Sequence, residues 1–207
     1  MNTKKTIYII RHGQTDYNKQ GIIQGSGIDS NLNSTGIQQA EQFHKAYHHI
    51  SFDNIYTSEL KRTQESVLPF VQGGASFEAI PELNEINWGI FEGLKGTNES
   101  RLIYKRILND WRAGLLDRAV DGGETPNEMF RRQDKGLTKI LSRKNEERIL
   151  ICMHGRAMRS FLCLLTETPL KEMDIFKHNN LCLYVLEQTA ERKFKVVEQN
   201  CSQHLWI

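Results

Sequence analysis

The sequence predicts an α/β protein, folded as a three-layer α/β/α sandwich with a mostly parallel central sheet. Short runs rich in β-branched residues alternate along the chain with longer stretches of helical period, as in folds where strands and helices follow one another. The runs at 6–10 and 149–153 are almost continuously apolar, which is typical of strands covered on both faces. Both observations favour parallel strands joined by helices.

Hydrophobic period and end signals place the individual elements. Strands are expected at 6–10, 53–57, 148–153 and 181–187, with two more at 75–80 and 194–198. Helices are expected at 36–49, 59–70, 99–113, 125–143 and 156–166. The start at Thr125 is the clearest, because Thr125 can cap the helix, Pro126 suits its first position and Glu128 completes a capping box.

We expect one domain over residues 1–207. The chain has no internal repeat, low-complexity tract or Pro/Gly-rich linker, and 207 residues can enclose one substantial core. Apart from its helix, the segment 93–123 is the least regular part of the chain, and it is rich in Arg and Lys. We expect this segment to form an irregular insertion over the site.

The composition is that of a globular protein, with 39% hydrophobic and 25% charged residues. No apolar run approaches the roughly 20 residues that cross a bilayer, and no secretory signal opens the chain. The net charge of +2 gives no reason to expect a nucleic-acid partner or a membrane partner. Four widely spaced cysteines suggest reduced thiols, so the expected location is cytoplasmic.

Two His-Gly pairs follow predicted strands. The strand at 6–10 runs directly into Arg11-His12-Gly13, and the strand at 148–153 runs into His154-Gly155. Ligands of open α/β sheets bind at the carboxyl ends of the strands, and the helix that starts after His154 offers unpaired N–H groups to an anion. We therefore expect both pairs, including the Gly155 backbone, to lie in one anion-binding site.

Two arginines and one glutamate complete this site. Arg11 adjoins His12, and Arg62 follows the strand at 53–57, so two guanidinium groups can bind phosphate oxygens. Glu85 lies near a loop rich in glycine and aromatic residues, where a carboxyl group suits general acid catalysis. The pattern predicts phosphoryl transfer, with His12 as the nucleophile that is transiently phosphorylated.

The chain resembles the histidine phosphatase superfamily, in its cofactor-dependent phosphoglycerate mutase-like branch. The matching segments, in the family's order, are Arg11-His12-Gly13-Gln14-Thr15-Asp16-Tyr17-Asn18, Gln24-Gly25, Thr57-Ser58-Glu59-Leu60-Lys61-Arg62-Thr63-Gln64-Glu65, Leu83-Asn84-Glu85, Glu92-Gly93, Gly123-Glu124-Thr125 and His154-Gly155. Two positions depart from the pattern, because Gln14 stands where the family usually has Glu and Asn31 where proline is common.

The resemblance implies a role for each matching residue. His12 is the residue phosphorylated, Arg11, Arg62 and His154 hold the phosphoryl group, and Glu85 is the proton donor. Further phosphate or substrate contacts are expected from Asn18 and Gln24. No metal ion or organic cofactor is implied, and 2,3-bisphosphoglycerate enters as a primer only if the protein is a mutase.

Arg156 directly follows the second His-Gly pair, where many relatives have a small residue. We expect it to contact a second anionic group of the substrate, although a surface position at a helix start is an equal alternative. On the helix at 36–49, Glu41, His44 and His48 share one face, but we interpret this face as solvated and not as a metal site.

Two enzyme activities share this chemistry. True glycolytic mutases of the family have a longer segment between the proton donor and the second histidine than Glu85 to His154 allows here. A phosphomonoesterase acting on small phosphorylated metabolites is therefore favoured, with phosphoglycerate mutase as the alternative and a non-catalytic phospho-ligand binding module as a remote one. The sequence leaves open whether the protein is a monomer or a homodimer.

Overall fold

The computed structural model describes residues 4–206. Six strands form one sheet in the order β3-β2-β4-β1-β5-β6. The strands are β1 Thr6–Arg11, β2 Asn54–Thr57, β3 Phe77–Ala79, β4 Arg148–Met153, β5 Leu183–Gln188 and β6 Phe194–Cys201. Neighbours from β3 to β1 pair in parallel, whereas β5 is antiparallel to both β1 and β6. The sheet is thus mostly parallel, as predicted.

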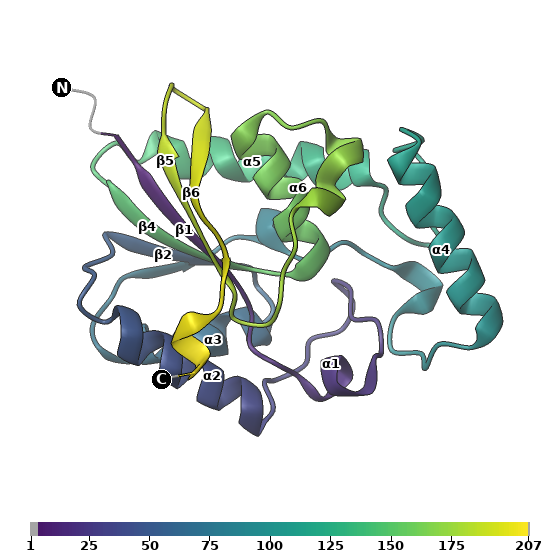
Figure 1. The fold of residues 1–207 in the computed structure, drawn as a ribbon, viewed down its shortest axis with the longest axis horizontal. Coiled ribbons are helices and arrows are strands. Elements are labelled where there is room, and N and C mark those ends of the chain that lie inside the picture. Colours follow the sequence, from purple (N-terminus) through teal and green to yellow (C-terminus); the bar gives the residue numbers. More distant parts are fainter. Residues whose placement is uncertain (1–3, 207) are drawn as a thin grey trace.

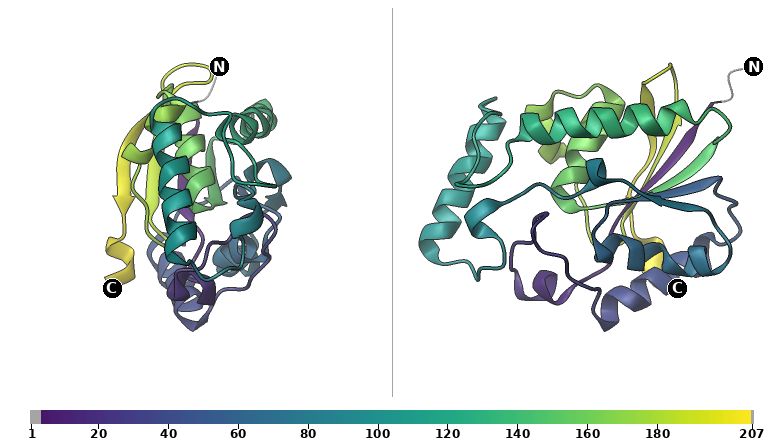
Figure 2. Two further views of the ribbon diagram at one scale, coloured as in Figure 1. Left: turned by 90° about the vertical axis from the view of Figure 1, so that its right-hand side faces the viewer. Right: turned by 180° about the vertical axis from the view of Figure 1, so that it is seen from behind.

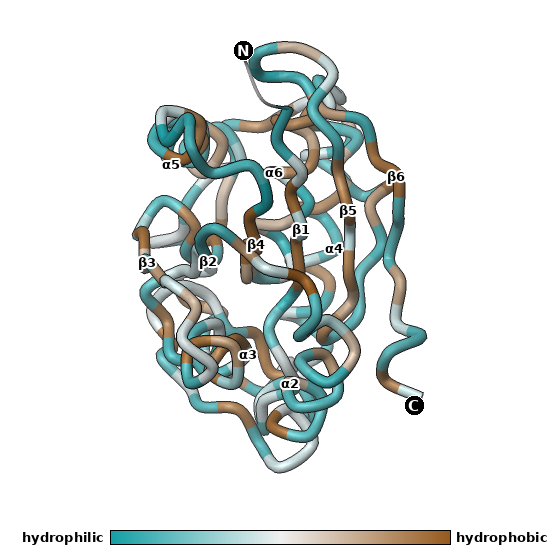
Figure 3. Tube along the Cα trace, turned by 90° about the vertical axis from the view of Figure 1, so that its left-hand side faces the viewer, coloured by the Kyte–Doolittle hydropathy of each residue, from teal (hydrophilic) through white to brown (hydrophobic). Residues whose placement is uncertain are grey.

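Helices cover both faces of the sheet. They are α1 Asp16–Gln20, α2 Ser34–Tyr47, α3 Lys61–Gln72, α4 Asn98–Arg112, α5 Pro126–Ser142 and α6 Gly155–Thr166. Figures 1 and 3 show α2 and α3 against one face and α5 and α6 against the other. Short 3₁₀ turns lie at Pro81–Leu83, Gly89–Phe91, Leu170–Ile175 and Gln203–Trp206. This is the predicted three-layer arrangement.

Alternating side chains of the central strands supply two cores. Ile7 and Ile9 of β1 belong to the cluster that packs under α5 and α6, whereas Ile10 belongs to the cluster with Phe43 of α2 and Phe70 of α3. Hydrophobic residues along these strands are visible in Figure 3. A strand buried on both faces needs apolar residues at successive positions, which explains the continuous run seen in the sequence.

Helix α5 begins as its sequence predicts. Thr125 accepts a hydrogen bond from the Glu128 backbone N–H, and the Glu128 side chain accepts one from the Thr125 N–H, which together form a capping box. Helix α1 is a finding that the sequence analysis missed. Its five residues are too few for a helical period, although Thr15 and Asn18 form a second capping box there.

Within the segment 93–123, α4 occupies Asn98–Arg112, which agrees with the helix predicted at 99–113. Thr97 caps this helix through the Ser100 N–H. Figures 1 and 2 show α4 standing apart from the helices that cover the sheet, beyond the carboxyl ends of the parallel strands and near α1. The segment 93–123 thus presents a helix on the side of the molecule where the predicted site lies. Within residues 4–206, no helix is both long and apolar enough to cross a membrane.

Candidate active site

A cavity of about 260 Å³ lies where β1 and β4 end. Seven of the nine site residues predicted from the sequence line it, namely Arg11, His12, Asn18, Gln24, Glu85, Gly155 and Arg156. The other two, Arg62 and His154, are fully buried next to it. The structure therefore brings the predicted residues together from segments that are far apart in the chain.

The sheet register sets the two histidines side by side. Arg11 of β1 pairs with Met153 of the neighbouring parallel strand β4, so the residues that follow them, His12 and His154, leave the sheet together. Their ring centroids lie 5.2 Å apart. The His12 N–H continues the pairing by donating to the Met153 carbonyl at 2.9 Å. This is why two short His-Gly motifs, separated by more than half of the chain, meet in one site.

His12 is held in one tautomer. Its Nδ1 lies 2.7 Å from the Gly13 carbonyl oxygen, and because a carbonyl only accepts, Nδ1 carries the proton and Nε2 keeps its lone pair. The ring is only 3% exposed. Burial, followed by the positive charges of Arg11 and Arg62, lowers the pKa of His12 well below 6.5. The imidazole is thus neutral at neutral pH.

Gly13 lets the end of β1 pack against the start of α2. A Cβ atom at Gly13 would lie 2.7 Å from the backbone oxygen of Gly36, and one at Gly36 would lie 2.1 Å from the oxygen of Gln14. Both contacts are with backbone atoms, which cannot swing aside. The Gly13 N–H donates to Ser66 Oγ at 2.9 Å, so the turn that carries His12 is fixed from α2 and α3.

A buried hydrogen-bond chain supports the site from beneath. Arg62 Nε donates to His154 Nδ1 at 3.1 Å, so the His154 proton is on Nε2, which lies 2.7 Å from Ser58 Oγ. Arg62 also donates to the carbonyls of Ile28 and Gly25. A guanidinium has five N–H groups, so two remain beyond these three bonds. Burial, with Arg62 and His12 nearby, lowers the pKa of His154 well below 6.5.

Glu85 binds the first turn of α6. Its Oε2 accepts from the Arg156 N–H at 3.0 Å and its Oε1 from the Ala157 N–H at 2.8 Å, while Oε1 also accepts from the Ile86 N–H. These bonds satisfy two of the unpaired donors at the helix start and hold the carboxyl group at the cavity wall. The N–H of Gly155, one residue earlier, has no acceptor among residues 4–206.

Asn18 and Gln24 reach the cavity from α1 and the loop after it. Asn18 Oδ1 accepts from the Thr15 N–H and from Asn180 Nδ2, the latter at 3.2 Å. Gln24 Nε2 donates to Thr15 Oγ1 at 2.7 Å, and its Oε1 accepts from Ser30. Both side chains line the cavity, and both also hold this loop in place.

Arg156 is bound more tightly than the sequence suggests. Its Nη1 lies 2.6 Å from Asp174 Oδ1, its guanidinium stacks over Trp111, and Arg112 and Arg159 bind the same carboxylate. Burial alone would raise the pKa of Asp174, but Arg156 and Arg159 outweigh it and lower the value to about 2. Arg156 is therefore nearly buried and not a surface residue.

Sequence reasoning missed several residues that line or support the cavity. His178 lines it, and its Nδ1 lies 3.4 Å from Arg11 Nη1. A Cβ atom at Gly155 would lie 3.0 Å from the His178 ring, so a larger residue there would need that ring to shift. Asn180 Nδ2 donates to the His12 carbonyl at 3.0 Å. The segment 176–180 has no motif that would have revealed these contacts.

Trp88 is buried, and it also lines the cavity. Arg11 Nε is buried with no hydrogen-bond partner among the described residues. An unpartnered guanidinium N–H suits an anionic ligand.

Within residues 4–206, no group of three or more His, Cys, Asp or Glu side chains is placed to hold a metal ion.

Comparisons with known proteins show the family to which the chain belongs. The model of the histidine phosphatase superfamily (branch 1) matches residues 7–202. The probable phosphoglycerate mutase GpmB of Erwinia tasmaniensis is 32% identical over 168 residues, which cover 79% of this chain and 75% of that protein. The uncharacterized phosphatase PhoE of Bacillus subtilis is 28% identical, with 96% of each chain covered.

A solved structure supports the same assignment. Bacillus stearothermophilus YhfR superposes with a TM-score of 0.82 at 26% identity, and the match covers 97% of this chain and 99% of that one. The family model spans all the elements that form the cavity, from β1 to the end of the sheet. The chain therefore belongs to branch 1 of the histidine phosphatase superfamily.

Proposed function

We propose that the protein is a phosphomonoesterase that hydrolyses small phosphorylated metabolites through a phosphohistidine intermediate on His12. The observation that carries this proposal is the neutral, buried imidazole of His12, whose Nδ1 proton is bound by Gly13 and whose Nε2 is left as the nucleophilic atom. A nucleophile of this kind needs no general base to become active.

In the first step, His12 Nε2 attacks the phosphorus atom, and the bond to the leaving oxygen breaks. Glu85 gives that oxygen a proton, so the product leaves as an alcohol. In the second step, Glu85 takes a proton from water, the water oxygen attacks the phosphohistidine, and inorganic phosphate and neutral His12 are released. The same carboxyl group thus acts as acid and then as base.

Positive charge and N–H groups stabilise the transferring phosphoryl group in both steps. We assign this role to Arg11, whose Nε is unpartnered, to the two remaining N–H groups of Arg62, and to the free N–H of Gly155 at the start of α6. His154 donates to the phosphoryl group only if its ring rotates so that the Nε2–H points from Ser58 toward the ligand. Asn18 and Gln24 bind substrate oxygens at the outer wall.

Arg156 keeps its proposed contact with a second anionic group of the substrate. Three arginines share the one carboxylate of Asp174, so positive charge remains at this wall.

Phosphoglycerate mutase activity is the second candidate, favoured by the name of the Erwinia tasmaniensis relative. It would require 2,3-bisphosphoglycerate as a primer, whereas hydrolysis requires no cofactor. Hydrolysis is favoured because the cavity adjoins a larger groove beside α4, from which water can approach.

One pair of assays distinguishes the two activities. Phosphate release is measured over a panel of phosphomonoesters, and conversion of 3-phosphoglycerate to 2-phosphoglycerate is measured with and without the bisphosphate primer. We expect phosphate release from several esters and no mutase turnover. Primer-dependent isomerisation without phosphate release would replace the proposal with the mutase alternative.

The charge state of His12 can be tested directly by NMR. Because burial and two arginines lower its folded pKa, protonation requires a pH well below 6.5, and the ring remains neutral when the pH is lowered to 6. Long-range ¹H–¹⁵N spectra at pH 6 are expected to show the Nδ1–H tautomer, with the His12 signal assigned by its loss in His12→Ala. A cationic ring at that pH would contradict the proposed nucleophile.

A further inference from the structure

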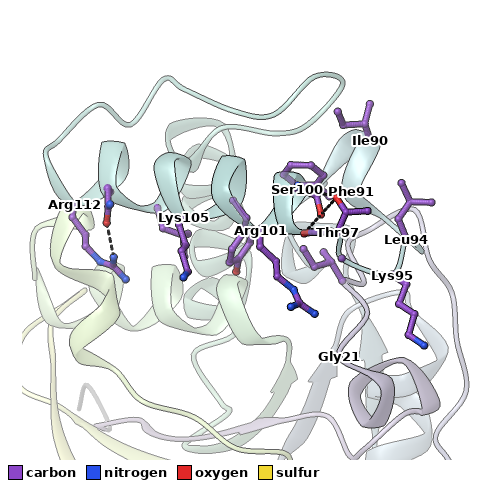
Figure 4. A pocket seen from close by; sticks show the side chains of 15 residues that line it. Gly21, Ile90, Phe91, Leu94, Lys95, Thr97, Ser100, Arg101, Lys105 and Arg112 are labelled. Carbon is purple, nitrogen blue, oxygen red and sulfur yellow. Dashed lines mark hydrogen bonds between the residues drawn. The ribbon is translucent and has the colours of Figure 1, made fainter.

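A second cavity, of about 820 Å³, lies between α4 and the loops that face it. Figure 4 shows its lining, with Gly21 below, the 90–97 segment at one end and one face of α4 above. The volume is in the range of pockets that bind small organic molecules. We call this cavity the α4 groove.

The α4 groove has an apolar lining. Ile23, Phe91, Tyr104 and Leu108 contribute to it, together with two side chains that are unusually exposed for their type, Ile90 at 56% and Leu94 at 61%. A cluster of exposed apolar side chains in a concave surface indicates a ligand that covers them.

The rim of the groove is basic. Lys95, Arg101 and Lys105 are exposed, and none of them forms an ion pair with another of the described residues. Figure 4 shows Arg101 and Lys105 projecting to the same side of α4, with Lys95 at the end of the groove. No acidic side chain lines the groove, so the charge on its rim is uniformly positive. This complements an anionic group on a ligand whose body is apolar.

The groove adjoins the active-site cavity. Ile23 and Tyr104 line both, and the Tyr104 ring lies 5.0 Å from the ring of Trp88, which is in the active site. The groove therefore lies next to the space that a substrate with its phosphate beside His12 would occupy.

We propose that the α4 groove binds the leaving group of the substrate, and that this group combines an apolar body, aromatic or aliphatic, with an anionic group at its far end, separate from the one assigned to Arg156. This inference rests on the proposed phosphomonoesterase activity and narrows its substrate class. The apolar body covers Leu94 and its neighbours, and the anionic end pairs with Arg101 and Lys105.

Two synthetic esters test the proposal by kinetics. Phenyl phosphate is compared with 4-(5-carboxypentyl)phenyl phosphate, which has a similar leaving oxygen but adds an apolar chain that ends in a carboxylate. We expect kcat/KM for the longer ester to be higher by about tenfold or more, because each buried methylene contributes up to about fourfold. Equal kcat/KM for the two esters would overturn the proposal and leave the phosphomonoesterase activity intact.

Matched variants locate the effect. Leu94→Ser and Arg101→Gln change the groove, whereas Leu102→Ser and Arg106→Gln change α4 residues that do not line it; Leu102 is 67% exposed, close to the 61% of Leu94. Arg101→Gln is expected to raise KM for the longer ester by about threefold, since exposed ion pairs are weak, and to spare phenyl phosphate. Equal effects of groove and control variants would contradict the assignment.

A binding measurement separates this inference from the proposed activity. The His12→Ala protein is titrated calorimetrically with each intact ester. Tighter binding of the longer ester, weakened by adding Arg101→Gln but not Arg106→Gln, would support the groove even if neither ester were hydrolysed. Equal binding of the two esters would overturn the inference. Equal binding is also the result expected if the groove instead binds another protein or a membrane surface.

Discussion

Replacing His12 with alanine is expected to reduce kcat by at least about 10⁴-fold, because the variant has no atom that can form the covalent intermediate. The substitution removes a buried ring whose centroid lies 5.2 Å from that of His154, and the Nε2 of His154 carries a proton and cannot replace it as the nucleophile. After brief mixing with ³²P-labelled substrate and denaturation, the natural protein is expected to retain an acid-labile, alkali-stable label, and His12→Ala is expected to retain none.

His48→Ala is the matched control, because His48 is exposed on the last turn of α2, away from the cavity. It should keep both turnover and label. Thermal unfolding of both variants checks that a loss of activity is not a loss of fold. Label that persists in a folded His12→Ala protein would move the phosphorylated position to another residue and contradict the mechanism.

Replacing Glu85 with glutamine is expected to cause a loss that depends on the leaving group. A poor alkoxide leaving group needs the proton that Glu85 supplies, so kcat/KM for an alkyl phosphate should fall by about 10²–10⁴-fold. A p-nitrophenolate group leaves without a proton, so kcat/KM for p-nitrophenyl phosphate should change little. The parameter kcat/KM is used because it reports phosphoryl transfer and not the later hydrolysis of phosphohistidine.

That later step also needs Glu85 as the base, so the variant should accumulate phosphoenzyme and release p-nitrophenol in a burst. Glu191→Gln, an exposed residue in the β5–β6 connection, makes the same chemical change outside the site and should behave as the natural protein. An equal fall in kcat/KM for the alkyl and the p-nitrophenyl ester would mean that Glu85 positions α6 through its backbone contacts and does not donate a proton.

The parts of the site that the sequence predicts are those set by local rules. An apolar strand followed by His-Gly places His12 and His154 at carboxyl ends of strands, and the parallel pairing of β1 with β4 then brings them together. The helix start at Thr125 was predictable for the same reason, since a capping box needs only four consecutive residues. Seven predicted residues share one cavity because each lies at such a strand end, helix start or adjoining loop.

Contacts made by tertiary packing were not predictable. Ser58 bonds to His154, and Asn180 bonds to the His12 carbonyl, through hydrogen bonds between residues 96 and 168 positions apart. No local pattern distinguishes such a serine or asparagine from those on the surface. The sequence also did not predict that Arg156 pairs with Asp174. Asp174 lies in a 3₁₀ turn, and no sequence pattern marks that turn.

Two buried histidines, His12 and His154, and the partly buried His178 also set an acid limit for the fold. Burial and neighbouring cations lower the folded pKa values of His12, His154 and His178, the last to about 3, whereas an unfolded chain binds a proton on each near pH 6.5. As the pH falls below 6.5, the unfolded state thus gains protons that the native state does not take up. Each ring then lowers the free energy of unfolding by up to about 1.4 kcal/mol for each pH unit below 6.5. The arrangement that keeps the nucleophile ready at neutral pH therefore makes the protein prone to unfold in acid.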